Sequence, residues 1–303
     1  MAASRSSRDP FAPENREAHL TVVGNGNFPL PGSGYSVLLN KFRTMPDHVL
    51  LVTEKFELQG AAPLTAPDLA AFYALVTDLP GAGFYNSGEA AGASQPHKHF
   101  QALPLDILAT YGAFRSLHYA VKTSESLRNT RSSTSSDKYG TGNFDSGGTD
   151  DEGNNQGLPF SPPVDRLLSR YAEVSFGATV GVARVLPELP FRHAFAPLDR
   201  SLRWAADGGE RLRRAYHSLL DVAGVAAPPT APSPAPSPYN LLLTAEWMLV
   251  VPRSQRKYGS IDVNGMGFLG CLLVRDEEGR STLQAATPST VLSAVGLPKS
   301  PGY

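Results

Sequence analysis

Cysteine is almost absent from this chain of 303 residues, which contains only Cys271. A single cysteine excludes an intramolecular disulfide and a multi-cysteine zinc site, and it suits a reducing compartment. An excess of charge is also missing, since 27 basic residues stand against 28 acidic ones. Without a strong field of one sign, the chain has no electrostatic reason to bind nucleic acid or an anionic membrane. We therefore expect neither partner, and we expect any anionic ligand to be held by a local site.

Long apolar runs are missing as well. No stretch of the sequence reaches the roughly 18 apolar residues that a membrane-spanning helix needs. The first residues, MAASRSSRDPF, are basic and serine-rich but lack the apolar core of a secretory signal. The sequence therefore predicts a cytoplasmic protein, with a brief organellar transit segment as the alternative.

Two segments of low complexity divide the chain. Residues 123–163 are rich in Ser, Thr, Asn, Gly and Asp, and they contain too few aliphatic side chains to offset the entropy lost on ordering. We predict a disordered insertion there. A proline-rich stretch at 226–238 predicts an extended connector. The resulting organisation is an N-terminal catalytic half at 1–122, the insertion, and a C-terminal half at 164–303.

The periodicity of the remaining sequence predicts an α+β fold, with an antiparallel sheet and helices packed against it. Thr65 is the expected N-cap of a helix at 66–79. The glycine-rich segment 24–34 is not a P-loop, because no Gly-Lys-Ser/Thr follows, and we expect a loop. A second helix is expected at 208–223, and strands are expected at 19–23, 35–39, 48–53, 84–85, 97–103, 239–244 and 247–252.

The most informative stretch is NSGEAAGASQPHKHFQALP at residues 86–104. Pro96 favours an extended start, and the alternation of a strand then places His97, His99 and Gln101 on one face. Lys98 and Phe100 would lie on the other face. The segment before the histidines has little side-chain bulk, so its backbone N–H groups can approach an anion closely. The residues of this expected anion cradle are Ser87, Gly88, Gly92, Ala93 and Ser94.

An imidazole can attack phosphorus without an external base, because one ring nitrogen is unprotonated at neutral pH. A hydrogen bond from the other nitrogen to a carbonyl would fix the tautomer. Two histidines at this spacing are also typical of a metal-ligand pair, or of ordinary hydrogen-bonded residues in a core. From the residues alone, these alternatives stay open. No Asp, Glu or Cys stands nearby to complete a metal site, so we expect no protein-bound metal.

Resemblance to a known family extends this interpretation. The stretch at 86–104 resembles the active-site segment of the diadenosine tetraphosphate (Ap4A) phosphorylases, or ATP adenylyltransferases, of the histidine-triad superfamily. The segments YSVLLNKF at 35–42, DHVLLVTEKFE at 47–57 and YNLLLTAEWMLVVPRSQRKYGSIDVNGMGFLGCLLV at 239–274 resemble other parts of the family in the same order. The resemblance implies a duplicated histidine-triad unit. It also implies the reaction of Ap4A with phosphate to give ATP and ADP.

In the implied mechanism, His99 attacks the α-phosphorus and His97 orients the site. Gln101 stands where the hydrolases of the superfamily carry histidine, and this difference favours transfer to phosphate over hydrolysis. The resemblance assigns nucleotide contacts to Lys41, Asn86, Gly92, Ala93, Ser94 and Gln95, and from the C-terminal motif to Asn240, Thr244, Arg253 and Lys257. The alternative for Asn240 is a turn cap, and the alternative for Arg253 and Lys257 is a solvated basic rim. Trp247 fits the core better than a base-stacking platform.

Several alternatives remain beside Ap4A phosphorolysis. One is a nucleotidyltransferase with adenylylsulfate or a nucleotide sugar as donor; others are a catalytically lapsed nucleotide-binding protein and a metal sensor. No cofactor is required by the sequence, although a divalent cation such as Mg²⁺ would accompany the polyphosphate. The segment DPFAPENREAHLTVV resembles a stretch well inside the family's N-terminal part, so we expect contacts from any earlier portion to be lacking.

Overall fold

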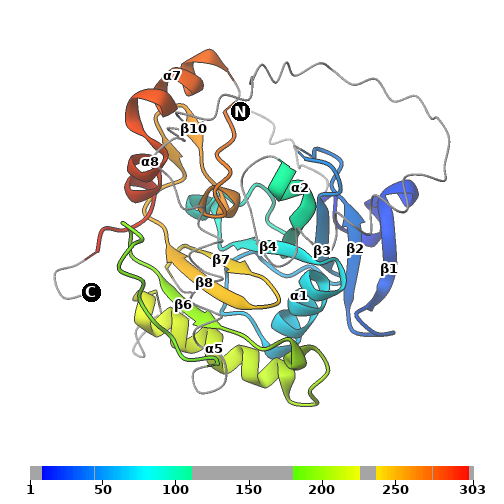
Figure 1. The fold of residues 1–303 in the computed structure, drawn as a ribbon. Coiled ribbons are helices and arrows are strands. Elements are labelled where there is room, and N and C mark those ends of the chain that lie inside the picture. The colour runs from blue at the N-terminus through cyan, green and yellow to red at the C-terminus, as the bar shows by residue number, and fades with distance from the viewer. Residues whose placement is uncertain (1–8, 44, 111–179, 226–236, 275, 300–303) are drawn as a thin grey trace, which may run out of the picture.

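The computed structural model describes residues 9–43, 45–110, 180–225, 237–274 and 276–299 (Figure 1). The insertion predicted at 123–163 lies outside the described residues, as does most of the connector predicted at 226–238. Within the described ranges, no helix combines the length and the apolar character needed to span a membrane.

Among the residues that the structure describes, an antiparallel sheet of eight strands organises the molecule, in the order β1-β2-β3-β5-β4-β7-β8-β6. Strands β4 and β7 pair with each other, so the N-terminal and C-terminal halves of the chain share one sheet (Figure 1). The strands are β1 (Thr21–Phe28), β2 (Tyr35–Leu39), β3 (Val49–Thr53), β4 (Gly81–Asn86), β5 (His99–Pro104), β6 (Ala194–Pro197), β7 (Tyr239–Leu243) and β8 (Trp247–Pro252), with a separate hairpin of β9 (Lys257–Tyr258) and β10 (Ile261–Asp262).

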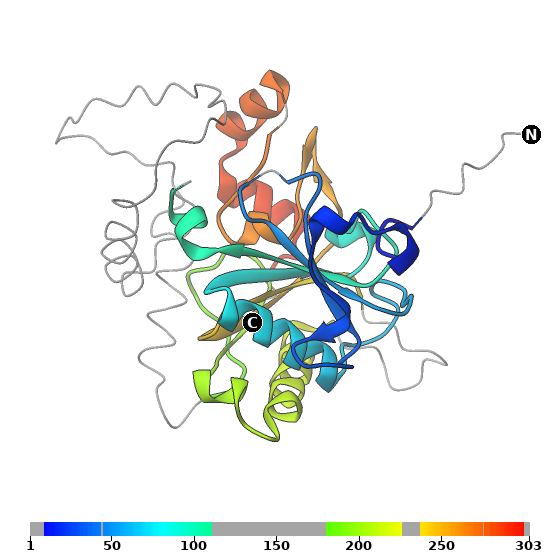
Figure 2. The ribbon, with the colours of Figure 1, turned by 90° about the vertical axis from the view of Figure 1, so that its right-hand side faces the viewer.

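Helices cover both faces of the sheet. The two longer helices, α1 (Ala66–Asp78) and α5 (Gly208–Ala223), pack side by side on one face (Figure 2). The other face carries α2 (Leu105–Thr110), α6 (Gly265–Phe268), α7 (Glu277–Ala286) and α8 (Pro288–Val295). Short 3-10 helices span Pro13–Asn15, Ala18–Leu20, Glu89–Ala91 and Arg200–Arg203. The predicted α+β class, with an antiparallel sheet and packed helices, is confirmed.

In the described part of the chain, the two largest hydrophobic clusters lie one on each face of the sheet, because side chains alternate along the central strands. Tyr85 and Phe100 belong to the core under α1 and α5, whereas Phe84 and Leu103 belong to the core under α6 and α8. Phe100 is fully buried, as its position in the strand predicted. Because Phe100 faces α1, its neighbours along β5 face the opposite side, and this is the side that carries the site.

Helix α1 begins where the sequence predicted. The Thr65 side chain accepts from the backbone N–H of Asp68, and the Asp68 carboxylate accepts from the N–H of Thr65, which completes a capping box. Asp68 is buried and also accepts from the hydroxyl of Tyr35 at 2.7 Å. The predicted helix at 208–223 and the strands at 35–39 and 247–252 are confirmed to the residue.

Other boundaries were predicted wrongly. Strand β1 extends from Thr21 to Phe28, so the glycine-rich segment 24–34 is a loop only in its second part. Pairing with β2 decides this, and the strand tolerates glycine because its register is broken by irregularities. Strand β6 was missed, because four residues that end in proline give too short a pattern.

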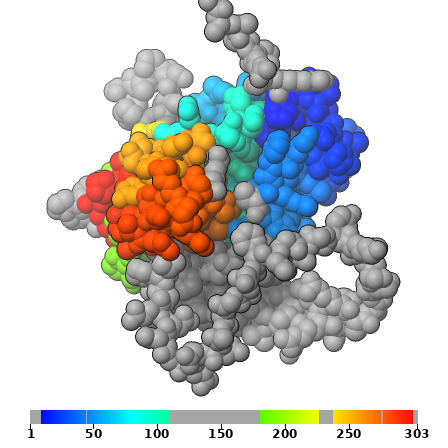
Figure 3. Space-filling model, turned by 90° about the horizontal axis from the view of Figure 1, so that it is seen from above, coloured from blue at the N-terminus to red at the C-terminus, as the bar shows by residue number. Residues whose placement is uncertain are grey.

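The order of the strands has a mirror relationship about the β4–β7 pair. On one side lie β5 and β3, and on the other lie β8 and β6. Helix α1 precedes β4 and β5 in the chain, and α5 precedes β7 and β8 in the same way. Seen from above, the C-terminal part of the chain lies on one side of the molecule and the N-terminal part on the other (Figure 3).

Candidate active site

His99 is the first residue of β5, and its imidazole is almost completely buried. Its Nδ1 lies 2.9 Å from the carbonyl oxygen of His97. Because a carbonyl can only accept, Nδ1 carries the proton and Nε2 carries the lone pair. Burial lowers the pKa of His99 to about 4, although the bond to His97 opposes the shift. The ring is therefore neutral near pH 7, with one nitrogen available for nucleophilic attack.

His97 lies on the same side of the sheet but has a different environment. Its Nδ1 contacts Oδ2 of Asp9 at 2.7 Å, and its Nε2 contacts the carbonyl oxygen of Thr53 at 2.9 Å. The ring of Phe11 packs against both histidines, with centroids 6.0 Å from His97 and 5.1 Å from His99. Since both nitrogens of His97 are bonded within the protein, this residue is placed to orient the site. Only His99 is placed to attack.

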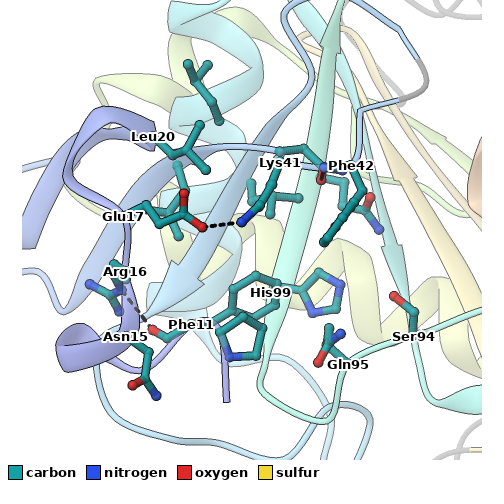
Figure 4. A pocket seen from close by; sticks show the side chains of 16 residues that line it. Phe11, Asn15, Arg16, Glu17, Leu20, Lys41, Phe42, Ser94, Gln95 and His99 are labelled. Atoms are coloured by element: carbon teal, nitrogen blue, oxygen red, sulfur yellow. Dashed lines mark hydrogen bonds and ion pairs between the residues drawn. The ribbon is translucent and has the colours of Figure 1, made fainter. Parts of the chain in front are cut away.

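A first pocket, of about 250 Å³, opens beside His99 (Figure 4). Its inner wall is apolar, with Leu38 and Leu50 from the sheet and Phe11 from the N-terminal segment. Its rim is polar. The rim residues include Glu17, Lys41, Ser94, Gln95 and Gln101.

A second pocket, of about 370 Å³, adjoins the first. The two pockets share Asn40, Phe42, Ser94 and Gln101 as lining residues. The rest of the second pocket comes largely from the C-terminal half of the chain, including Arg256, Asp262, Asn264 and Cys271. The site therefore has two compartments that meet at Ser94 and Gln101, and His99 lines the first of them.

Gln101 follows His99 on the same face of β5 and lines both compartments. Its neighbour there is His48, which is buried and has an Nε2 without a hydrogen-bond partner among the described residues. Burial lowers the pKa of His48 to about 4, and the side-chain amide of Gln101 opposes the shift. Gln101 is thus a neutral amide beside two uncharged imidazoles.

The predicted anion cradle is a tight turn formed by residues 88–95. Gly88 and Gly92 have φ angles of 87° and 93°, which favour glycine. A Cβ on Gly92 would lie 2.8 Å from Cα of Asn264, so this position also needs the smallest residue. The turn carries Ser94 into both pockets and Gln95 into the first. Ala93 is buried, and Ser87 has a buried Oγ without a partner among the described residues.

Lys41 lines the first pocket, as its predicted contact with phosphate requires. Its Nζ lies 2.6 Å from Oε1 of Glu17 (Figure 4). The hydrogen bond to Lys41 lowers the pKa of Glu17. Lys257, in contrast, is an exposed residue of the β9–β10 hairpin; its Nζ lies 3.6 Å from Oδ2 of Asp262, and it does not line either pocket.

Four of the predicted contact residues are buried and line neither pocket: Asn86, Asn240, Thr244 and Arg253. The Oδ1 of Asn86 accepts from Nδ2 of Asn240 at 2.8 Å and from the N–H of Gly265 at 2.9 Å. The alternative reading of Arg253 as a solvated rim is wrong, because its guanidinium is bonded to interior oxygens. Thr244 caps the β7–β8 turn, and Trp247 is buried in the core as expected.

Sequence reasoning missed several lining residues. Phe11 and Glu17 come from the N-terminal segment, and Asn264 and Cys271 come from the far end of the chain. Only tertiary contacts bring these segments to His99. The side chain of Phe42 is 81% exposed although it is large and apolar, and that exposure marks it as a residue at the junction of the two pockets.

Comparisons with known proteins agree with this architecture. The Ap4A phosphorylase N-terminal domain matches residues 2–115, and the ATP adenylyltransferase C-terminal domain matches residues 187–298. The chain belongs to the Ap4A phosphorylase family. The two matched segments of this family member contribute the two sides of the shared sheet, and each contributes residues to the second pocket.

Two proteins from Saccharomyces cerevisiae are similar to this chain over most of its length. Diadenosine 5',5'''-P1,P4-tetraphosphate phosphorylase 2 is 28% identical over 312 residues, which cover 94% of this chain and 78% of that protein. Protein APA1 is 27% identical over 308 residues, covering 94% of this chain and 76% of that protein.

Solved structures are similar as well. Yeast Ap4A phosphorylase Apa2 in complex with AMP is 25% identical, with a TM-score of 0.60, over 97% of this chain and 83% of that chain. Apa2 in complex with Ap4A has a TM-score of 0.60 and 24% identity, over 97% of this chain and 82% of that chain.

Proposed function

We propose that this protein is an Ap4A phosphorylase, which converts Ap4A and phosphate into ATP and ADP. The observation that carries the proposal is a buried, neutral His99 that lines one of two adjoining pockets. A substrate with two nucleoside ends joined by a phosphate chain needs such a two-compartment site. Family membership and the likeness to a yeast enzyme named for this activity support the same conclusion.

The reaction proceeds in two displacements. Nε2 of His99 attacks the α-phosphorus of one adenosine, the bond from phosphorus to the bridging oxygen breaks, and ATP leaves. AMP is then bonded to the imidazole. An oxygen of orthophosphate attacks the same phosphorus, the phosphorus–nitrogen bond breaks, and ADP leaves with the electron pair returned to His99. The bond from Nδ1 to the carbonyl of His97 stabilises the charge that Nε2 acquires in the intermediate.

The two pockets divide the substrate between them. We place the AMP moiety in the first pocket, because His99 lines it and its inner wall of Leu38, Leu50 and Phe11 suits a base. The phosphate chain then passes Ser94 and Gln101 into the second pocket, where Arg256 offers positive charge to the ATP moiety. Lys41 neutralises phosphate charge at the rim of the first pocket. A solved relative in complex with AMP supports a nucleotide site of this kind.

In this proposal, the second pocket is supported by three buried residues, Asn86, Asn240 and Arg253. They fix the turn at 88–93 and the segment that carries Asn264, and both of these line the second pocket. Their part is therefore to position the groups that contact the substrate.

The mirrored strand order supports a finer proposal about the fold. Each half contributes one long helix followed by two antiparallel strands, α1 with β4 and β5, and α5 with β7 and β8. We propose that these are two copies of a histidine-triad unit. The first copy retains His99 at the start of β5, whereas the corresponding strand β8 carries no histidine.

A divalent cation enters the proposal only as a companion of the polyphosphate. In the part of the chain that the structure describes, no three His, Cys, Asp or Glu side chains are grouped to hold a metal ion. Phosphate oxygens and water would then supply the ligands of Mg²⁺. Rates measured with Mg²⁺ and with a chelator test this. If the substrate brings the cation, the Mg²⁺ concentration needed for full activity should increase with the concentration of Ap4A.

Incubation with Ap4A, with and without phosphate, tests the function directly. Chromatography should show ATP and ADP in equal amounts, with ADP dependent on phosphate. The His99→Ala variant should lose the activity, while His217→Ala, a control on α5, should retain it. Release of AMP without phosphate would instead indicate a hydrolase, and equal turnover by His99→Ala and the unaltered protein would remove His99 as the nucleophile.

A further inference from the structure

The backbone of His99 lacks a strand partner on one side. Strands β4 and β5 pair from Gly81 and Pro104 up to Phe84 and Gln101, and their ladder ends there. On the other side, His99 is paired with Val52 of β3. The nucleophile therefore lies where the sheet has opened, and its own N–H and C=O point toward the gap between β4 and β5.

The side chain of Gln59 fills this gap. Its Oε1 accepts from the backbone N–H of His99 at 2.9 Å, and its Nε2 donates to the carbonyl oxygen of His99 at 3.2 Å. The same Nε2 donates to the carbonyl oxygen of Asn86, the last residue of β4, at 2.8 Å. One side-chain amide thus replaces the missing rung between the two strands, and it is bonded to both backbone polar groups of the nucleophile.

The segment that carries Gln59 also holds the acceptor of the imidazole. The N–H of Gln59 donates to the carbonyl oxygen of Pro96 at 2.7 Å, and the N–H of Lys98 donates to the carbonyl oxygen of Glu57 at 2.7 Å. A bridge pairs Leu58 with His97, whose carbonyl accepts from Nδ1 of His99. Residues 57–59 therefore fix the backbone of the nucleophile through a side chain, and fix the partner of its ring through the main chain.

Gln59 itself has little freedom to move. It is buried, and the next residue, Gly60, has a φ angle of 75° and donates its N–H to the hydroxyl of Tyr85 at 2.9 Å. A Cβ on Gly60 would lie 2.9 Å from the backbone nitrogen of Gly88, so the chain passes closely against the turn that begins the anion cradle. The position of the Gln59 side chain is thus set by packing against the turn at 88–95, which carries Ser94 and Gln95 into the pockets.

We infer that Gln59 is a positioning residue for catalysis: its side-chain amide holds the backbone of His99 so that Nε2 keeps its line of attack on phosphorus. The inference rests on the proposed function, in which His99 is the nucleophile. Gln59 does not line either pocket, so it acts through His99 and does not contact the nucleotide. Its loss should therefore slow formation of the AMP–histidine intermediate more than it weakens nucleotide binding.

Three variants separate positioning from simple support of the fold. Gln59→Leu removes both the donor and the acceptor. Gln59→Glu keeps the shape but, when ionised, presents a carboxylate to two carbonyl oxygens and loses the donor; once protonated, it can again donate and accept. Gln284→Leu, on the exposed surface of α7, is the matched control for changing an amide to an apolar group.

The measurement is the single-turnover rate of AMP transfer to His99 from Ap4A without phosphate, together with the affinity for AMP and the thermal unfolding midpoint. We expect Gln59→Leu to slow transfer by about 10- to 100-fold, with the affinity for AMP changed by no more than about 3-fold. The rate of Gln59→Glu, relative to that of the unaltered protein, should rise as the pH falls and the carboxyl becomes protonated. Gln284→Leu should match the unaltered protein.

The outcomes distinguish the two proposals. If the unaltered protein forms no AMP–histidine intermediate, the proposed function fails, and with it the inference. If it does form the intermediate and Gln59→Leu forms it at the same rate, only the positioning role is overturned. A Gln59→Leu variant that loses AMP affinity and transfer rate in equal proportion, with no recovery of Gln59→Glu at lower pH, also overturns it, because that pattern indicates structural support alone.

Discussion

Nη1 of Arg253 lies 2.6 Å from Oδ1 of Asn240, inside the molecule and away from solvent. Both side chains also donate to the carbonyl oxygen of Ala91, at 3.2 Å and 2.8 Å. Further bonds join Arg253 to the carbonyl oxygens of Val263 and Val295. A residue of the C-terminal half thereby holds the turn of the N-terminal half that bears Gly92 and Ser94. The two halves are coupled at the place where the second pocket is formed.

We expect Arg253→Met to destabilise the protein, because several buried carbonyl oxygens and the Asn240 amide lose their donor. Hydrogen bonds to a charged group contribute on the order of 1.5–3 kcal/mol each, and the loss should reach about 3 kcal/mol or more. The thermal unfolding midpoint should fall by roughly 5–10 °C. Differential scanning calorimetry measures the change, with Arg213→Met on the exposed surface of α5 as the control. An unchanged midpoint would show that the hydrogen-bonded cluster of Arg253, Asn240 and their carbonyl partners is not needed for stability.

The cluster also shows what the sequence could and could not reveal. Local signals were sufficient for α1, whose capping residue Thr65 is followed by a helical apolar pattern, and for the alternation that buries Phe100 and presents His99. They were not sufficient for Arg253, since a basic residue after a strand looks the same whether it faces phosphate or a set of carbonyl oxygens. The two cases differ in whether the guanidinium is buried, and for Arg253 this burial depends on contacts with α8 and with the turn at 88–95.

The lining of the pockets was hidden for a related reason. Phe11 and Asn264 are separated from His99 by long stretches of chain, and nothing in their local sequence marks them as neighbours of a nucleophile. Gln59 was missed because its part depends on the opening of β4 from β5, which is a property of strand pairing. Motif residues could be found from spacing, whereas the residues that hold them required the fold.

The acid limit of the first chemical step should reveal the pKa of His99. Burial lowers this pKa to about 4, and attack requires the unprotonated ring. The rate of AMP transfer in the absence of phosphate should therefore stay constant as the pH falls through 6.5, and it should decline only toward pH 4. Rapid-quench measurements on protein that circular dichroism shows to be folded provide the test. A decline centred near 6.5 would mean that the imidazole is solvated and unlike the ring described above.

Folding stability should decrease in acid because of buried neutral histidines. Nε2 of His193 accepts from the N–H of Leu186 at 2.9 Å, and Nδ1 lies 2.8 Å from the carbonyl oxygen of Phe191. Burial lowers the pKa of His193 to about 4 from its ordinary 6.5. The unfolded chain therefore binds more protons between these values, so the contribution to stability is complete above 6.5 and is lost as the pH falls toward 4.

The His193→Gln variant isolates this contribution. Its free energy of unfolding should be lower than that of the unaltered protein at neutral pH, and it should change less across the acid range, by up to about 3 kcal/mol. Urea unfolding at a series of pH values gives both quantities. His19→Gln, whose side chain is 73% exposed, is the control and should leave the pH dependence unchanged. A pH dependence that survives in His193→Gln without reduction would assign the effect to other groups.

Lys41→Met should weaken nucleotide binding with little effect on the chemical step. Lys41 lines the first pocket at its rim, where its ammonium is shared between Glu17 and the phosphate chain proposed for that pocket, and it does not contact the reacting nitrogen. We expect KM for Ap4A to rise by about 10-fold, with kcat changed much less. Lys257→Met, which removes an exposed lysine outside both pockets, should leave both constants unchanged. A fall in kcat alone would place Lys41 in the transition state and contradict this assignment.

Gln101→His should turn the enzyme toward hydrolysis. An amide at this position can donate to the nucleotidyl phosphate but cannot deprotonate water, so an acceptor that is already anionic, such as orthophosphate, has the advantage. A histidine there can act as a general base. We expect the variant to release AMP from Ap4A without phosphate, at least about 10-fold faster than the unaltered protein. Gln101→Asn, which keeps the amide, is the matched control and should gain no hydrolysis. If Gln101→His forms the AMP–histidine intermediate but transfers it only to phosphate, the preference for phosphate lies elsewhere in the site, with the Ser94 turn as the next candidate.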